Sequence, residues 1–247
     1  MTADPAVIAA VAAGGLVLGT LADPFVDQIY SDPLLYSPFG RCARCNTKLL
    51  PFGAIALLGY ARWRGACPHC GRRFPLRTLL LPFGAAALFA ITLIAYDDPW
   101  RIALTIGFGM LALLFLVTDA ERRTLPDRLM YPVLALALVL APFWPQHEAY
   151  NAYLTGAGLL LLFVLLRRWL GVRIGLGDVK FALLIGLTLA MPDTLIAFAV
   201  AGIAAFGAII VVFAESGPPA RLLPYSSMLA TGMIFALLWG EPLRNAV

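Results

Sequence analysis

The chain has 247 residues, of which 61% are hydrophobic and only 13% are charged, and its mean hydropathy is +0.86. A soluble globular domain is close to half apolar and a quarter charged, so this composition excludes an ordinary soluble protein and indicates a chain built for lipid. The net charge of +4 does not by itself indicate nucleic acid, because no RNP, helix-turn-helix or zinc-finger helix pattern accompanies it.

Apolar stretches run through most of the chain. The first, over residues 5–24, predicts a retained membrane helix, because it lacks the basic segment that opens a signal peptide. Seven more stretches approach the roughly 20 residues that a span needs: 78–96, 101–118, 129–145, 151–170, 179–192, 194–214 and 223–240. The sequence therefore predicts an all-α polytopic membrane protein with about eight transmembrane helices. The boundary between the sixth and seventh rests on Met191-Pro192-Asp193.

The basic residues indicate how these helices are oriented. If both termini lie outside, the cytoplasmic loops are residues 31–77, 119–128, 167–180 and 215–222. Every Lys and Arg except Arg101 and Arg244 then falls in one of these loops. An excess of basic residues on the cytoplasmic side is the usual rule for membrane proteins. In this orientation the basic residues face the anionic lipid of the inner leaflet, which explains the positive net charge without a nucleic-acid partner.

The first cytoplasmic loop contains four cysteines. They form two CxxC pairs 21 residues apart, Cys42 with Cys45 and Cys67 with Cys70. Two such pairs are typical of a tetrahedral metal site, and disulfides rarely persist in the cytosol. We expect a structural zinc ion held by four thiolates, with His69 as a bystander. Iron in the same sulfur cage, or free thiols, are the alternatives.

The predicted metal site divides the chain into three parts. A loop as short as residues 31–77 has too little core to fold alone, and a closed four-thiolate site supplies folding energy without an open position for chemistry. We therefore expect a small cytoplasmic zinc-binding loop domain there. Residues 1–30 form the first transmembrane helix before it, and residues 78–247 form a seven-helix transmembrane core after it.

Two aspartates at the ends of apolar stretches face the same cytoplasmic side in this topology. Asp119 ends the run LFLVTD, and Asp178 lies in GLGDVK. A carboxylate is costly in lipid and marks a function or a pairing. Two carboxyls that share a proton can cut a peptide bond, one as a base on water and the other as an acid on the carbonyl. Gly175 and Gly177 would let an extended substrate approach Asp178 closely.

Simpler roles exist for some of these residues. Asp178 and Asp127 can each be a helix cap, worth about 1 kcal/mol, and Asp127 fits this role well because it follows Pro126. Asp119 fits it poorly, because the helix dipole disfavours a negative charge at a C-terminus. The stretch PYSSMLATG over residues 224–232 is expected to serve close helix packing.

Taken together, these motifs resemble the type IV prepilin peptidases, which are membrane aspartyl proteases of the GxGD kind, over nearly the whole chain. The resemblance implies that Asp119 and Asp178 are the catalytic dyad. It implies that Asp127, with Pro126 before it, and Lys180 belong to the surrounding motif with the two glycines of GLGD. The paired CxxC motifs between the first and second spans are the other mark of this family.

The resemblance also implies what the protein acts on. The substrate would be a prepilin or pseudopilin of a type IV pilus or type II secretion system, cleaved at the cytoplasmic face of the bacterial inner membrane. A second activity would N-methylate the new N-terminus with S-adenosylmethionine. The chain departs from the family here, because Thr78 stands where the family carries a glutamate associated with methyl transfer. A peptidase without methyl transfer is therefore an alternative.

Three acidic residues near the inner end of the first span are candidates to contact the basic leader of such a substrate: Asp23, Asp27 and Asp32. Asp23 stands where the family usually has an asparagine. For Asp23 and Asp27 the simpler explanation is that both lie at the membrane interface, where charge costs less. A different class of function is a proton-coupled transporter that uses Asp119 and Asp178 as a relay, although the two halves show no internal repeat.

Overall fold

The structure is a computed structural model that describes residues 4–30, 45, 60, 62, 64–71, 73, 76–169, 175–216 and 225–246. Cys42, Asp32 and the side chain of Asp27 lie outside the described residues. The chain divides into two compact units, unit 1 over Met1–Ile94 and unit 2 over Ala95–Val247.

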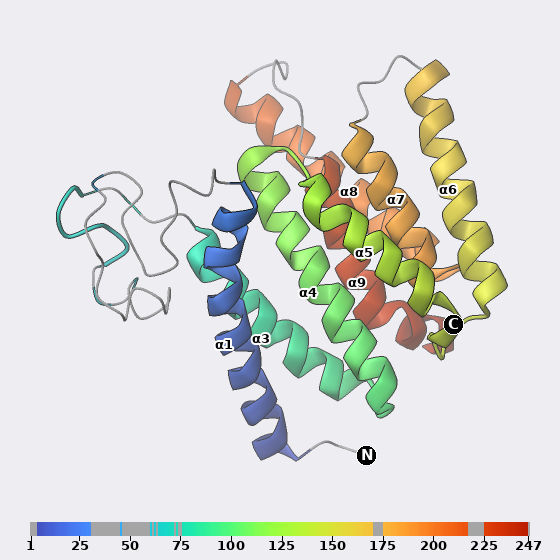
Figure 1. Cartoon of the computed structure of the whole chain (residues 1–247), viewed down its shortest axis with the longest axis horizontal. Helices are drawn as coiled ribbons and strands as arrows, with labels where there is room; N and C mark the ends of the chain where they lie inside the picture. The colour runs from blue at the N-terminus through green and yellow to red at the C-terminus, as the bar shows by residue number, and fades with distance from the viewer. Residues whose placement is uncertain are drawn as a thin grey trace. The chain divides into compact units, whose positions relative to one another are not determined.

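Each predicted span coincides with a helix (Figure 1). The helices are α1 (Pro5–Tyr30), α3 (Arg77–Ala95), α4 (Pro99–Arg122), α5 (Asp127–Leu140) with a 3₁₀ turn η2 (Ala141–Phe143), α6 (Ala149–Trp169), α7 (Leu176–Leu189), α8 (Asp193–Ser216) and α9 (Tyr225–Ala246). The predicted break between the sixth and seventh stretches is confirmed, because α7 and α8 are separate helices. In the described residues the one β interaction is an isolated bridge between Ala66 and Arg73.

Five of these helices are long and apolar enough to cross a membrane: α1, α3, α4, α6 and α8. The helices α5 and α7 have 14 residues each, fewer than the roughly 20 that a span perpendicular to the bilayer needs. The chain therefore fits a helical multi-pass membrane protein. Eight complete crossings and the division into three parts remain predictions.

The two helices described in unit 1 meet along glycines of α1. A Cβ atom at Gly15 would lie 2.7 Å from the backbone oxygen of Ala85, and one at Gly19 would lie 2.5 Å from that of Leu81. No side chain fits at these distances. The glycines therefore let the backbones of α1 and α3 touch, as small residues do between membrane helices.

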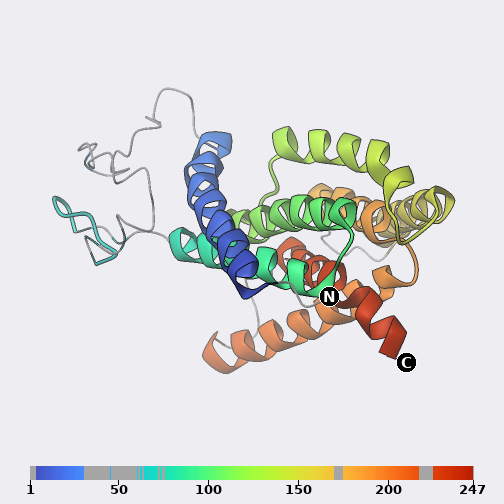
Figure 2. The same cartoon turned by 90° about the horizontal axis from the view of Figure 1, so that it is seen from below.

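In unit 2, α7 lies between other helices. It packs against α5, α6, α8 and α9, and Figures 1 and 2 show α5 and α6 beside it. The sequence FALLIGLTL is apolar on all faces, which is typical of a buried helix. Phe181 is fully buried and meets Phe115 of α4 edge to face, with 5.5 Å between the ring centroids. The start of α7, with Asp178, is therefore held from several sides.

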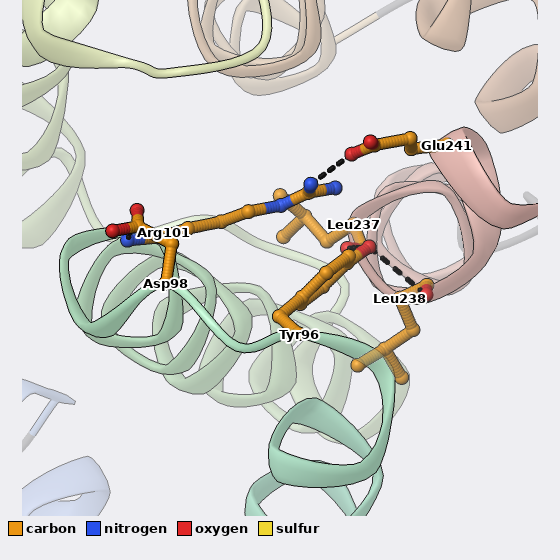
Figure 3. Close-up of polar contacts among 6 residues, drawn as sticks. All are labelled: Tyr96, Asp98, Arg101, Leu237, Leu238 and Glu241. Atoms are coloured by element: carbon orange, nitrogen blue, oxygen red, sulfur yellow. Dashed lines mark hydrogen bonds and ion pairs between the residues drawn. The ribbon is translucent and has the colours of Figure 1, made fainter. Parts of the chain in front are cut away.

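A polar cluster ties the start of α4 to the end of α9 (Figure 3). Asp98 caps α4 by accepting a 2.9 Å hydrogen bond from the N–H of Arg101. The Arg101 guanidinium pairs with Glu241 and lies 3.6 Å from the ring centroid of Tyr96. The Tyr96 hydroxyl donates to the backbone oxygen of Leu237 over 2.7 Å. Arg101, which falls outside the predicted cytoplasmic loops, is thus a buried partner in an ion pair.

Candidate active site

Asp119 lies in the last turn of α4, and only 4% of the residue is exposed. The helix ends because Arg123 adopts a left-handed conformation (φ 54°, ψ 31°) and its N–H donates to the backbone carbonyl of Asp119 over 2.8 Å. Pro126 follows soon after, as is common beyond a helix end. The helix dipole does not stabilise a carboxylate at this position, so its stabilising partners must come from other elements.

Asp178 is the third residue of α7 and is also buried. Its Oδ2 accepts a 3.0 Å hydrogen bond from the N–H of Gly175, the residue that caps the helix. A Cβ atom at Gly175 would lie 3.1 Å from this same oxygen, so a larger residue would crowd the carboxylate. Asp178 does take part in capping α7, but this uses only one of its two oxygens.

The start of α9 supplies a donor to each aspartate. The hydroxyl of Ser226 donates to Oδ1 of Asp178, and the N–H of Ser227 donates to Oδ2 of Asp119 over 2.7 Å. Because the two serines are adjacent, the structure brings both carboxylates to one place, where their charges interact. The sequence predicts only helix packing for this stretch and reveals neither contact.

The arrangement suits acid–base chemistry. Two like charges held close together in a buried site favour a state in which the pair holds a single proton. The ionised carboxylate can then accept a proton from water while the protonated one donates a proton to a carbonyl oxygen. Asp119 and Asp178 come from different helices of unit 2 and meet at the start of a third.

Lys180, two residues after Asp178, forms an ion pair with Asp127. The Nζ of Lys180 lies 2.6 Å from Oδ1 of Asp127 and 4.3 Å from the ring centroid of Tyr131. The residue that caps α5 is Pro126, which makes no side-chain bond to the helix, so the expected cap role of Asp127 is wrong. Its carboxylate instead connects the start of α5 to the start of α7.

Gly177 lets the loop between α4 and α5 approach α7. A Cβ atom at Gly177 would lie 3.3 Å from the Cβ of Leu125, closer than most real contacts of this kind. In Figure 1, α4 ends at the edge of unit 2 where α5 and α7 begin. The predicted supporting residues all belong to segments that meet there: Gly175, Gly177, Lys180, Pro126 and Asp127.

Three of the four cysteines are described, and they cluster in unit 1. The Sγ atoms of Cys45, Cys67 and Cys70 all lie within 4.8 Å of one another, and those of Cys45 and Cys67 are 3.8 Å apart. This is far longer than a disulfide bond of about 2.05 Å. It matches the separation of about 3.8 Å between two ligands of a tetrahedral ion with zinc–sulfur bonds of about 2.3 Å. The cluster can hold a metal ion.

Asp23 is buried on α1, and its carboxylate has partners within unit 1. It accepts hydrogen bonds from Nε of Arg77 over 2.8 Å and from the hydroxyl of Thr78 over 3.0 Å. Thr78, at the position where the sequence departs from the resembled family, therefore contacts an acid on the neighbouring helix. A substrate leader that bound Asp23 would have to compete with Arg77.

Comparisons with known proteins cover most of the chain. The family model described as "Type IV leader peptidase family" matches residues 105–213, and "Bacterial Peptidase A24 N-terminal domain" matches residues 14–96. No solved structure matches the chain.

Three curated proteins with the name "Prepilin leader peptidase/N-methyltransferase" are similar to the chain. That of Pseudomonas aeruginosa is 30% identical over 233 residues, covering 85% of this chain and 75% of its own length. That of Stutzerimonas stutzeri is 28% identical and covers 84% of this chain and 74% of its own length. The match to that of Dichelobacter nodosus is 32% identical over 111 residues, or 44% of this chain and 38% of its own length.

Proposed function

The chain belongs to the type IV leader peptidase family and is a peptidase, and from this we propose that it is an aspartic endopeptidase that removes the leader of prepilins or pseudopilins. The observation that carries the proposal is the meeting of two buried carboxylates, Asp119 and Asp178, on adjacent donors of α9. Membership in a peptidase family sets aside the alternative that the same pair serves a proton-coupled transporter.

The proposed reaction is general acid–base catalysis by this dyad. The ionised carboxylate accepts a proton from water as the water oxygen attacks the scissile carbonyl carbon, and the protonated carboxylate donates its proton to the carbonyl oxygen. When the tetrahedral gem-diol adduct collapses, the C–N bond breaks, the leaving amine takes the proton held by one carboxyl, and a hydroxyl of the adduct gives its proton to the other carboxylate. The products are a free amine and a carboxylic acid, and the aspartates return to a state with one proton between them.

We assign a supporting role to the residues around Asp178. The N–H of Gly175 orients its carboxylate, and Gly177 leaves room for the loop that carries Pro126. The ion pair of Lys180 with Asp127 links the two helix starts at this edge of unit 2. Together these contacts hold in place the segments that deliver the dyad.

The proposed location is the bacterial inner membrane, with the dyad at the cytoplasmic face and both termini outside. The distribution of basic residues supports this orientation, because nearly all of them fall in loops on the side of Asp119 and Asp178. The names of the curated relatives supply the substrate class. A basic leader followed by an apolar helix would place its scissile bond at this membrane face. Asp23, Asp27 and Asp32 remain proposed leader contacts.

We propose a structural zinc ion in the cytoplasmic loop, with Cys42, Cys45, Cys67 and Cys70 as ligands. The support is the sulfur geometry of the three described cysteines, which fits a tetrahedral site. Four thiolates close the coordination sphere, so the ion would contribute folding stability to the loop and take no part in peptide cleavage.

N-methylation of the new N-terminus with S-adenosylmethionine is a second candidate activity. The names of the curated relatives favour it, and the presence of Thr78 in place of the family's glutamate opposes it. Mass spectrometry of the mature product separates the two cases. A product heavier by one methylene than the unmodified peptide supports methyl transfer, and an unmodified N-terminus supports the peptidase alone.

The peptidase proposal is tested by cleavage of a prepilin in proteoliposomes that contain the full chain. Asp119→Asn and Asp178→Asn are each expected to abolish cleavage, because one carboxyl cannot do the work of base and acid together. Glu121→Gln is the matched control, since Glu121 is an exposed acid on the same helix two residues after Asp119. Cleavage at the parent rate by both aspartate variants would refute the proposal.

A further inference from the structure

We propose that Ser226 and Ser227, at the start of α9, are positioning residues for the dyad. The hydroxyl of Ser226 orients Asp178, and the backbone N–H of Ser227 orients Asp119. This inference rests on the proposed function, because it assigns roles within the same site. It goes beyond the proposed function because it names α9 as the element that sets the distance and orientation between the two carboxylates.

Asp178 has a separate donor on each carboxylate oxygen. Oδ2 accepts from the N–H of Gly175 on its own helix, and Oδ1 accepts from the hydroxyl of Ser226 on α9. Two donors from different elements fix the plane of a carboxylate, which one donor cannot do. Ser226 is only 4% exposed, so bulk water does not readily replace its hydroxyl when the side chain is shortened.

Asp119 accepts a hydrogen bond at Oδ2 from the backbone N–H of Ser227, whose side chain also acts on this carboxylate. The first N–H groups of a helix have no acceptor within the helix, so the N–H of Ser227 in the first turn of α9 is available to another element. The start of a helix also carries partial positive charge, which stabilises a carboxylate beside it. Asp119 lacks such stabilisation at the end of its own helix, and α9 provides it.

The adjacency of the two serines couples the aspartates. Neighbouring Cα atoms are about 3.8 Å apart, so the two donors are fixed relative to each other by one peptide unit. The helix that carries them packs against both α4 and α7, on which the aspartates lie. A small displacement of α9 would therefore move both contacts together, and the separation of the carboxylates depends on this one helix start.

The test is a series at position 226 that varies the donor, measured by prepilin cleavage. Ser226→Ala removes the donor, Ser226→Cys keeps the shape with a weak donor, and Ser226→Thr keeps the hydroxyl. We expect kcat to fall about tenfold in the alanine variant, which is typical of a lost hydrogen bond to a charged group, with KM unchanged. Threonine should restore kcat and cysteine should fall between the two.

The dependence of kcat on donor strength separates positioning from a purely structural role. A positioning role predicts that kcat falls in the order Ser226→Thr, Ser226→Cys, Ser226→Ala, whatever the order of thermal stability of these variants. Ser227→Pro removes both the N–H and the hydroxyl that act on Asp119, so it should also lower kcat with KM unchanged.

Thr231→Ala is the matched control, because Thr231 is exposed on α9 and its hydroxyl donates to the backbone oxygen of Ser227 and to no carboxylate in the described contacts. A parent value of kcat in Ser226→Ala would overturn the inference, as would a kcat order that follows thermal stability instead of donor strength. If Asp119→Asn and Asp178→Asn still abolish cleavage in that case, the proposed function stands and only the role of the serines falls.

Discussion

The Cα atom of Gly156 on α6 lies 2.6 Å from the position that a Cβ atom at Gly186 on α7 would occupy. The two helices therefore meet backbone to backbone at a point where no side chain fits. This contact lies on the helix that carries Asp178 at its start, about two turns further along, so it holds that helix against α6.

Gly186→Ala is expected to lower the free energy of unfolding by about 1–3 kcal/mol, because the added methyl group forces α6 and α7 apart. Chemical denaturation in detergent micelles measures the change. Gly158→Ala on α6 is the control, since a Cβ atom there would have nothing within 4 Å and alanine favours a helix. Equal destabilisation by both variants would contradict the close contact.

Arg101→Met is expected to destabilise the chain by about 1–3 kcal/mol. The guanidinium is nearly buried between Glu241 and the ring of Tyr96, and its loss leaves the carboxylate without this ion pair. The side chain of Glu241 is 33% exposed, so water offsets part of the cost. Arg128→Met, at an exposed position of α5, should change stability by less than about 0.5 kcal/mol. A matching loss in both variants would argue against a special role for Arg101.

Asp127→Asn is expected to change stability by less than about 1 kcal/mol, because the Asp127 side chain is 61% exposed and exposed ion pairs contribute little. Prepilin cleavage should persist at a reduced rate, since the dyad keeps its own donors. This separates Asp127 from Asp119, whose replacement should abolish cleavage. Complete loss of cleavage in a folded Asp127→Asn variant would show that the ion pair with Lys180 does more than link two helix starts.

Cys67→Ser is expected to prevent binding of the proposed zinc ion, because Cys67 is the buried member of the thiolate cluster. Metal analysis of the purified chain should fall from one zinc per chain to none, and the loop should become sensitive to added protease. His69→Ala is the control, since His69 is exposed and is not needed as a ligand. If the zinc content falls equally in the His69→Ala variant, the assignment of four thiolate ligands is wrong and His69 is one of the ligands.

The helices could be predicted because their signal is local. Each membrane stretch is a run of apolar residues that ends near a charge, a proline or a glycine, and all eight stretches coincide with helices. The stretch 129–145 extends beyond its helix, which stops at Leu140. Pro142 explains this end, since it has no N–H to donate to the carbonyl of the preceding turn and η2 replaces the last turn.

The acids of the candidate site could also be proposed from sequence, and the family resemblance that they carried is confirmed. The hydrogen-bond donors to these two aspartates could not be proposed from the sequence. Ser226 and Ser227 gain their roles only when α9 packs beside α4 and α7, more than 100 residues from Asp119 in the chain. One of the two donors is moreover a backbone N–H, and the residue type at a position does not indicate which partner its backbone N–H will have. The same holds for the contact of Asp23 with Thr78, which joins residues of separate helices.

The length of α7 has a further consequence for how water reaches the scissile bond. At 1.5 Å per residue its 14 residues span about 21 Å, whereas the hydrocarbon layer is about 30 Å thick. If its first turn is the end that falls short of the membrane surface, Asp178 lies below that surface and water reaches it through a locally thinned bilayer or an aqueous funnel. A substrate helix that entered this region would lose lipid cover over its first turns, which would favour unwinding of the helix around the bond to be cut.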